Sequence, residues 1–433
     1  MPATRMAPIP ETRTTPASDA RTVPAPDVRT VPAPDAQTAP APPPAREIWF
    51  AAWPVVALFV LSNAAMPLYA VWQHQIGFTS GTLTLIYAAY MAGLLGALPV
   101  AGVASDRLGR KPVLIPALLL GVVACLIYAT ASSVAALVAA RLLTGVATGA
   151  AVSAGMAAVT DIAAGRRLGP LLASTGMVLG AGIGPVLAGV LSETVPGPTV
   201  TVFVVEAVLL ATALAMTARM PLPRRSTDSA SRSGSWVRLP AVPRDNRRHL
   251  ALGLAAFAPG ISGTGFVLSL GPSLLAGLLD TANRALVGGM ALAMFLSATG
   301  VQFALRRTAV RTTLLASGAA TVAGTLALIT AVHTATLAPL VAAVILAGAG
   351  QGAGQLGGLT LLSRKVPATR RAEANAALNA GGYFLAGALP VADGYLSDAI
   401  GLPAAATLFG LTVAALAVAG AALVAVRGGE AAG

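Results

Sequence analysis

The chain has 433 residues, of which 56% are hydrophobic and only 10% are charged, and its mean hydropathy is +0.77. Soluble domains carry about 25% charged residues, so this composition excludes an ordinary soluble protein. It predicts an all-α membrane protein with a lipid bilayer around it. The net charge of +12 could suggest nucleic-acid binding, but the basic residues lie scattered between apolar segments. We therefore expect no nucleic-acid partner.

The first 47 residues differ from the rest of the chain. An eight-residue repeat runs from Arg21 to Val28 and again from Arg29 to Ala36, and an altered third copy follows. The high proline content blocks helix and sheet, and there is little apolar surface to fold around. The sequence predicts a disordered cytoplasmic tail over residues 1–47, with the role of the repeat left open.

Twelve apolar segments follow the tail, each long enough for the roughly 20 helical residues that cross the hydrocarbon core. They form two sets of six with a long polar stretch between them. Helices are predicted at 50–72, 80–102, 112–130, 134–158, 169–192, 199–218, 251–273, 282–304, 312–331, 336–362, 372–396 and 402–426.

This spacing predicts a domain organisation of two bundles and a linker. The N-terminal six-helix bundle covers residues 48–218, the cytoplasmic linker 219–250 and the C-terminal six-helix bundle 251–427. Residues 428–433 are expected to form a short tail.

The basic residues indicate which way the chain crosses the membrane. With the N-terminus inside, the inner short loops hold twelve Lys and Arg residues and the outer loops hold one, Arg284. Short cytoplasmic loops are the ones that collect Lys and Arg. Because Arg greatly outnumbers Lys and Ala and Gly are abundant, we expect a bacterial source. The sequence therefore predicts a multi-pass protein of the bacterial inner cell membrane with both termini in the cytoplasm.

The two halves resemble each other in sequence. Residues 137–149 align with 340–352, and residues 181–193 align with 386–398, at offsets of 203 and 205. Chance similarity between Ala-rich helices would not be expected to give two matches whose offsets are nearly equal. Parallel repeats of six helices with a substrate site between them are one known way to build a transporter.

A densely charged turn separates the second and third apolar segments. Three cations in five residues cannot lie in hydrocarbon, so the turn must reach water at a membrane face. Its pattern and its position resemble the signature loop between helices 2 and 3 of the major facilitator superfamily of transporters. The resemblance covers most of residues 48–427 and implies two pseudo-symmetric six-helix bundles. The residues that carry it are Gly102, Asp106, Arg107, Gly109, Arg110 and Lys111.

The resemblance also implies a gate. In this family the acidic residue of the loop engages charges and a helix end of the other bundle, which holds the cytoplasmic side shut. This assigns that role to Asp106, with Arg107, Arg110 and Arg166 as candidate partners. The corresponding loop of the second half, 306–311, has no acidic residue, so such a gate would be asymmetric.

Arg141 lies inside the fourth predicted helix. Placing an arginine side chain there costs about 2.5 kcal/mol of free energy or more unless it faces water or a partner. One alternative is that the side chain extends, or snorkels, to the outer interface. Together with Gly145 and Gly149 it resembles the family's helix-4 motif, whose arginine is implicated in proton transfer in proton-coupled exporters. The resemblance thus makes Arg141 a candidate for proton coupling.

The fifth predicted helix resembles the motif that marks the antiporter branches of the superfamily, although Ala188 replaces one of its glycines. A kinked, closely packed helix would show the same residues, because proline removes a helix hydrogen bond and glycine removes bulk. The motif residues are Gly180, Gly184, Pro185 and Gly189.

Proton coupling also needs an acid within the membrane. Many drug exporters of this family carry one in the first helix, but here that helix contains no acid after Glu47. The remaining membrane acids are Glu206 in the sixth helix and Asp393 in the eleventh, and either could titrate if desolvated. Desolvation is equally consistent with Glu206 being a protonated structural group that takes no part in transport.

Polar and aromatic side chains within the predicted helices are candidates for a substrate cavity. Polar side chains are sparse along these helices, which suits a hydrophobic solute, including a cationic one. For each amide side chain, hydrogen bonding between helices is the alternative role. The candidates are Asn63, Tyr69, Tyr90, Met177, Phe266, Gln351, Gln355, Asn379 and Tyr383.

Two transport functions and one other class are consistent with this pattern. The first is proton-driven efflux of a hydrophobic drug-like compound or metabolite by a monomeric drug:H+ antiporter-like protein. The second is an uptake symporter or facilitator of a small nutrient on the same fold. A membrane enzyme or receptor is the third, but His74, His249 and His333 are isolated and Cys125 is the only cysteine. We therefore expect no enzyme activity, no cofactor and no metal site.

Overall fold

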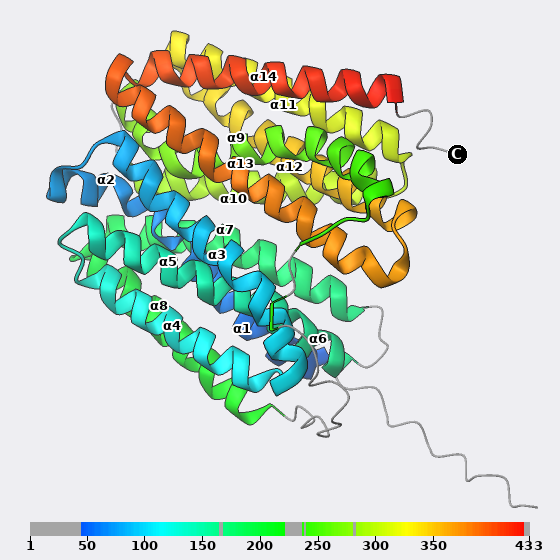
Figure 1. The fold of residues 1–433 in the computed structure, drawn as a ribbon. Coiled ribbons are helices and arrows are strands. Elements are labelled where there is room, and N and C mark those ends of the chain that lie inside the picture. Colours follow the sequence, from blue (N-terminus) through cyan, green and yellow to red (C-terminus); the bar gives the residue numbers. More distant parts are fainter. Residues whose placement is uncertain (1–44, 164–167, 221–235, 238–239, 280–282, 428–433) are drawn as a thin grey trace, which may run out of the picture. The chain divides into compact units, whose positions relative to one another are not determined.

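The apolar segments fold into long helices, since only a helix satisfies the backbone of a single segment in hydrocarbon. The computed structural model describes these helices and most of their connections (Figure 1). Residues 1–44 of the predicted N-terminal tail, 221–235 and 238–239 of the predicted linker, the predicted tail 428–433 and Arg166 lie outside the described residues. Residues 45–47, which were predicted to be part of the disordered tail, instead belong to the first helix. The described residues are 45–163, 168–220, 236–237, 240–279 and 283–427.

The N-terminal half has helices at all six predicted positions. Two of the predicted spans are interrupted. The first breaks at a 3-10 turn, Met66–Leu68, because Pro67 cannot donate a backbone hydrogen bond. The fourth contains a wider turn at Ala151–Gly155. The helices are α1 Ala45–Ala64, α2 Tyr69–Trp72, α3 Ser80–Leu108, α4 Lys111–Ala129, α5 Val134–Ala150, α6 Met156–Ala163, α7 Leu168–Thr194 and α8 Pro198–Arg219.

The C-terminal half also has helices at its six predicted positions. Eleven spans among the described residues are long and apolar enough to cross a membrane. The remaining predicted span, the eleventh in chain order, corresponds to α13, which has ample length but is more polar, since it carries Asn375, Asn379 and Asp393. The helices are α9 Arg247–Leu279, α10 Arg284–Leu305, α11 Val310–Thr334, α12 Leu337–Lys365, α13 Arg371–Ile400 and α14 Leu402–Arg427.

Glycine seams hold corresponding helix pairs together in both halves. A Cβ atom at Gly145 of α5 would overlap the backbone carbonyl of Tyr90 in α3. A Cβ atom at Gly348 of α12 would overlap the carbonyl of Met294 in α10 in the same way. Small residues let helices approach this closely in a membrane. The sequence repeat therefore corresponds to a repeated packing interface.

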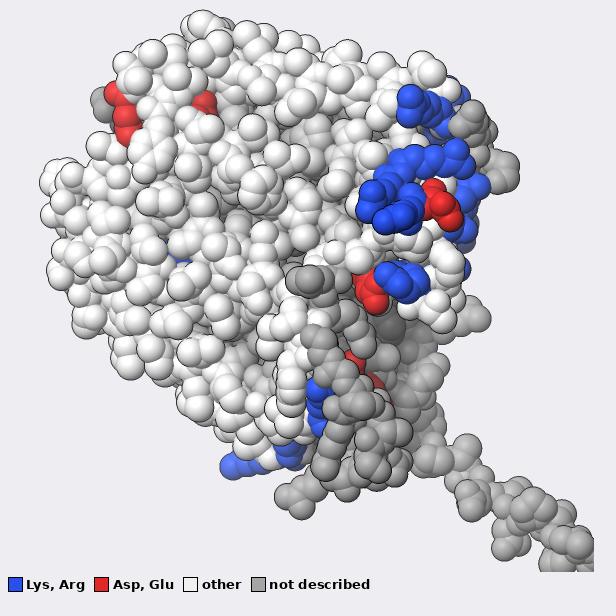
Figure 2. Space-filling model, viewed as in Figure 1, with Lys and Arg blue, Asp and Glu red and all other residues white. Residues whose placement is uncertain are grey.

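Basic residues at the inner loops cap helix ends in both halves. Lys111 Nζ donates to the carbonyl of Ala218 at 2.9 Å, near the end of α8. Arg311 Nη2 donates to the carbonyl of Ala425 at 3.2 Å, near the end of α14. The carbonyl end of a helix carries partial negative charge, so a cation there is favourable. Figure 2 shows groups of Lys and Arg side chains on the visible face at this end of the described helices.

The two bundles meet along two helix pairs, α3 with α13 and α7 with α10. A Cβ atom at Gly387 of α13 would lie 3.8 Å from the Met91 side chain of α3. A Cβ atom at Gly182 of α7 would lie 2.6 Å from Leu292 of α10. Both pairs also form hydrogen bonds at the end where α3 and α10 begin. With the topology predicted above, this is the outer end.

Replacing Gly145 with leucine should destabilise the N-terminal bundle, because the new side chain cannot fit against the carbonyl of Tyr90. We expect a loss of about 3 kcal/mol and a fall in melting temperature of about 5 °C. Thermal unfolding followed by tryptophan fluorescence measures this. The matched control is Gly102→Leu on α3, where a Cβ atom would meet no atom within 4 Å. Equal melting temperatures for the two variants would contradict the proposed seam.

Candidate substrate and coupling site

Arg141 is buried in the N-terminal bundle and has defined partners. Its side chain is 1% exposed, so it does not snorkel to the interface. Its Nη1 donates to the carbonyl of Ser62 at 2.6 Å. Its Nε and Nη2 both donate to the hydroxyl of Tyr69. The guanidinium carbon also lies 5.1 Å from the centre of the Tyr69 ring and 5.8 Å from that of Tyr90.

The break in the first span places these partners. Ser62 belongs to α1, whereas Tyr69 begins α2 after the 3-10 turn. Ser62 supplies a backbone acceptor and Tyr69 supplies both a hydroxyl acceptor and a ring face. The hydrogen-bond partners of Arg141 among the described residues include no carboxylate. The cation is therefore solvated by neutral groups, which leaves its charge uncompensated in a region of low dielectric constant.

Arg110 organises the signature loop. Its Nη1 donates to Asp106 at 3.0 Å and to the hydroxyl of Ser105 at 2.9 Å. Its Nε donates to Asp161 of α6 at 3.0 Å. Burial opposes the charge of Arg110, but the hydrogen bonds to Asp161 and Asp106 outweigh it and raise the pKa of the guanidinium. Asp106 thus has its predicted partner Arg110, which belongs to the same half of the chain.

The other residues of the loop have separate roles. Gly109 ends α3 with a φ of +97°, a conformation that favours glycine. Arg107 lies 4.7 Å from the ring centre of Trp236. Lys111 caps α8, as described above. Gly102 faces open space, since a Cβ atom there would meet nothing within 4 Å.

The antiporter-like motif makes α7 a closely packed helix on two sides. Cβ atoms at Gly180 and Gly184 would meet the carbonyls of Val56 and Val60 in α1. On the other side, a Cβ atom at Gly189 would meet the carbonyl of Arg284, and Pro185 lies against Gly288, both in α10. Helix α7 therefore packs between its own bundle and the opposite one. The close packing expected from the motif is present, whereas a kink at Pro185 and the link of the motif to antiport remain predictions.

Glu206 and Asp393 are both buried and lack hydrogen-bond partners. Glu206 in α8 is 0% exposed and Asp393 in α13 is 4% exposed. Neither side chain has a partner for either carboxyl oxygen in the structure. Burying an unpaired carboxylate in such surroundings costs several kcal/mol. Their positions differ, because α13 packs against the opposite bundle and α8 packs against α4 and α1.

Two of the amide candidates bind neighbouring helices. Gln351 Oε1 accepts from the hydroxyl of Thr264 at 3.1 Å, and Gln355 Oε1 accepts from Gln302 Nε2 at 3.4 Å. Both bonds stay within the C-terminal half. These residues therefore follow the alternative of interhelical hydrogen bonding. In contrast, Asn379 Oδ1 of α13 is buried without a partner.

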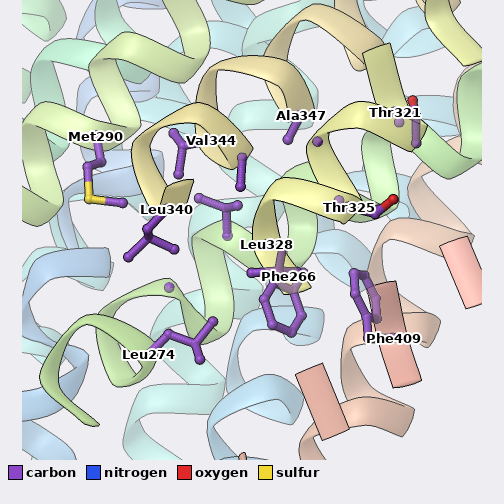
Figure 3. Close-up of a pocket in the computed structure, with 16 residues that line it drawn as sticks. Phe266, Leu274, Met290, Thr321, Thr325, Leu328, Leu340, Val344, Ala347 and Phe409 are labelled. Carbon is purple, nitrogen blue, oxygen red and sulfur yellow. The ribbon is translucent and has the colours of Figure 1, made fainter. Parts of the chain in front are cut away.

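An apolar cavity of about 30 Å³ lies inside the C-terminal bundle (Figure 3). Phe266 lines it and stacks on Phe409 with ring centres 4.4 Å apart. The wall is apolar except for Thr321 and Thr325. Sites for drug-sized ligands measure about 300–1,000 Å³, so this cavity is too small for one. Phe266 thus belongs to the interior of one bundle and not to a cavity between bundles.

The remaining candidates are divided between the two bundles. Asn63 Nδ2 donates to the hydroxyl of Ser62 at 3.1 Å, beside the backbone carbonyl that binds Arg141. Tyr90 is 8% exposed, and Met177 of α7 is partly buried. Tyr383 of α13 packs against the hydrophobic cluster that contains Tyr90. The structure thus brings Asn63, Tyr69, Tyr90 and Arg141 together and leaves Gln351, Gln355 and Phe266 elsewhere.

Sequence reasoning missed two kinds of functional residue. The motifs in the sequence give no role to Asp161, although an acid directly before an inner loop is a natural partner for the basic turn, and Asp161 pairs with Arg110. Glu193 and Asp398 appeared only as aligned positions of the repeat, yet each binds the opposite bundle. Among the described residues, no three His, Cys, Asp or Glu side chains lie in a group that could hold a metal ion.

The fold and the buried charged groups define a membrane transport protein built from two related bundles. Residues 48–337 match the model of the Major Facilitator Superfamily. Since the match covers more than half of the chain, the chain belongs to this superfamily of transporters. The protein is therefore a multi-pass membrane transporter for a small-molecule substrate.

Solved structures share this fold at low sequence identity. The nucleoside transporter NupG is 15% identical with a TM-score of 0.67, covering 87% of this chain and 98% of NupG. A bacterial homologue of the human lysosomal transporter Spinster, in an inward-facing and occupied conformation, is 13% identical with a TM-score of 0.71. That match covers 89% of this chain and 96% of the homologue. No curated protein matches the sequence closely.

Removing the hydroxyl of Tyr69 should expose the cost of burying Arg141. The variant Tyr69→Phe leaves Nε and Nη2 without their acceptor, which should cost about 1–3 kcal/mol in stability. The matched control is Tyr128→Phe, because the buried hydroxyl of Tyr128 has no partner to lose. Adding Arg141→Met to Tyr69→Phe should restore stability without restoring transport.

Thermal unfolding and transport assays on the same preparations measure these effects. We expect Arg141→Met to enter the membrane but to lose energised transport. Undiminished transport in that variant would make Arg141 a purely structural residue.

Proposed function

We propose that the protein exports a hydrophobic, drug-like compound or metabolite in exchange for protons, by alternating access. The observation that carries this proposal is Arg141, which is buried and held by Tyr69 and a backbone carbonyl. The same position carries the proton-coupling arginine in the exporter motif that the sequence resembles. A cation without a carboxylate partner is sensitive to any charge that arrives nearby.

Asp393 is the better of the two acidic candidates for proton coupling. It lies on α13, which packs on α3 of the opposite bundle, and it lacks a hydrogen-bond partner. Rearrangement of this interface would change its surroundings and thus its proton affinity. Glu206 lies within the N-terminal bundle, away from the helix pairs that join the bundles. We assign Glu206 the role of a protonated structural group.

The loop around Asp106 is assigned to the inner gate. Its contacts with Arg110 lie within one half of the chain, and Gly102 on the same helix faces open space. Among the described residues, Ser80 and Arg284 form hydrogen bonds between the bundles at the opposite end. This arrangement supports a state that is closed outside and open inside. In the opposite state, closed inside and open outside, the absence of a side chain at Gly102 would let the C-terminal bundle approach α3 closely.

Uptake of a small nutrient remains the second candidate. The fold is shared with NupG, which is a nucleoside transporter, so the fold alone does not select a direction. The motif on α7 favours export, because it resembles the motif of the antiporter branches. The two directions differ in how they respond to the proton gradient, and this can be measured.

Cells that express the protein should accumulate less of a fluorescent lipophilic dye than cells with the empty vector. Collapse of the proton gradient with an uncoupler should remove the difference, because inward proton flow drives the export. Asp393→Asn should lose energised efflux and Glu206→Gln should retain it. Efflux that persists without the gradient, or higher dye accumulation in expressing cells, would contradict proton-driven export.

A further inference from the structure

A carboxylate of the C-terminal bundle binds the start of a helix in the N-terminal bundle. Asp398, near the end of α13, accepts from the backbone N–H groups of Ser80 and Gly81 at 2.9 and 3.0 Å. Ser80 and Gly81 are the first two residues of α3. Among the described amides of α3, the side chain of the N-cap residue Thr79 accepts the N–H of Thr82, at 3.3 Å, and not those of Ser80 and Gly81. Asp398 therefore satisfies amides that the helix's own cap leaves unpaired.

A carboxylate of the N-terminal bundle does the same in the other direction. Glu193 Oε1, near the end of α7, accepts from the backbone N–H of Arg284 at 2.9 Å. It also accepts from Arg284 Nε at 2.9 Å, which adds an ion pair. Arg284 is the first residue of α10, whose N-cap Asn283 accepts from the N–H of Leu286 at 2.8 Å.

The two contacts are related by the internal repeat. Glu193 and Asp398 are 205 positions apart, and the N-cap residues Thr79 and Asn283 are 204 positions apart. In each contact the N-cap binds the third amide of its helix while the carboxylate of the other bundle binds the first. Two independent parts of the chain thus form the same arrangement. We call these contacts the outer clamps.

The α3 clamp also depends on glycine at two positions. A Cβ atom at Gly81 would lie 2.6 Å from Asp398 Oδ2, so no side chain fits between the carboxylate and the helix start. A Cβ atom at Gly394, one turn before Asp398, would lie 2.9 Å from the carbonyl of Ser80. The backbones therefore approach closely enough for the carboxylate to reach both amides.

The clamps act only while the outer ends of the bundles are together. The start of a helix carries unpaired N–H groups and partial positive charge, so a carboxylate there is stabilising. In each clamp the acceptor and the donors belong to different bundles. Separation of the outer ends would break both clamps and return all of these groups to water.

We propose that Glu193 and Asp398 are paired latches that keep the outer side closed and set the balance between the two access states. This inference rests on the alternating access proposed above, but not on the substrate or on protons. Loss of the two carboxylates should favour the outward-open state. Because Glu193 also pairs with the side chain of Arg284, the two latches need not contribute equally.

Distances between spin labels on the two bundles test the latches without any substrate. Cysteines replace Ser132, between α4 and α5, and Thr336, before α12; both positions are exposed and lie at the outer end. Cys125 is replaced by alanine, since it is the only native cysteine. The double variant Glu193→Gln/Asp398→Asn is compared with the labelled parent in lipid nanodiscs.

The expected result is a new population of longer outer distances in the double variant, about tenfold larger than in the parent. Each single variant should give an intermediate population. Glu193→Asp and Asp398→Glu keep the charge and should restore part of the parental distribution. The matched control is Glu373→Gln, whose partner Arg370 lies on the same bundle at 2.7 Å.

An unchanged distribution in a double variant with parental melting behaviour would overturn the proposal, as would an equal change in the Glu373→Gln control. If the double variant does not fold, the single variants and the charge-retaining pair provide the same comparison. Failure of the dye-efflux experiment would contradict proton-driven export only, because these distances report the access state directly.

Discussion

The bilayer core supplies no hydrogen-bond partners, so the protein must satisfy its backbone polar groups internally, and each buried polar side chain without a partner carries a free-energy cost. Arg141 is the strongest case: its guanidinium is buried and binds Tyr69 and the carbonyl of Ser62. The same constraint explains the glycine seams, where close backbones replace the hydrophobic force that lipid cannot provide. It also makes the burial of Glu206 and Asp393 without partners energetically costly.

Helix α3 connects the outer clamp at Asp398, the buried Arg141 and the loop around Asp106. Its first residues bind Asp398 of the opposite bundle, and its middle contributes Tyr90 beside Arg141. Its last turn carries Asp106, which binds Arg110. A single continuous helix thus extends from the outer clamp past the buried cation to the loop assigned to the inner gate. Movement of α3 against α13 would therefore affect all three places together.

The sequence predicted what depends on local pattern and missed what depends on distant contacts. Helices formed at all twelve predicted positions, because a continuous apolar segment of about 20 residues has few other solutions in a bilayer. The burial of Arg141 could be anticipated, but its partner Tyr69 lies 72 positions away on a helix that restarts after a break. Phe266, Gln351 and Gln355 were predicted as cavity residues, and the contacts that the structure gives them lie within one bundle.

The sidedness of α3 tests the account most directly. A cysteine at Gly102, in a variant that lacks Cys125, replaces a residue that faces open space near the signature loop. A membrane-impermeant maleimide should label it in inside-out vesicles and not in intact cells, and the outer-clamp double variant should reduce the labelling rate. Labelling in intact cells, or no labelling from the inner side of the parent, would contradict the account.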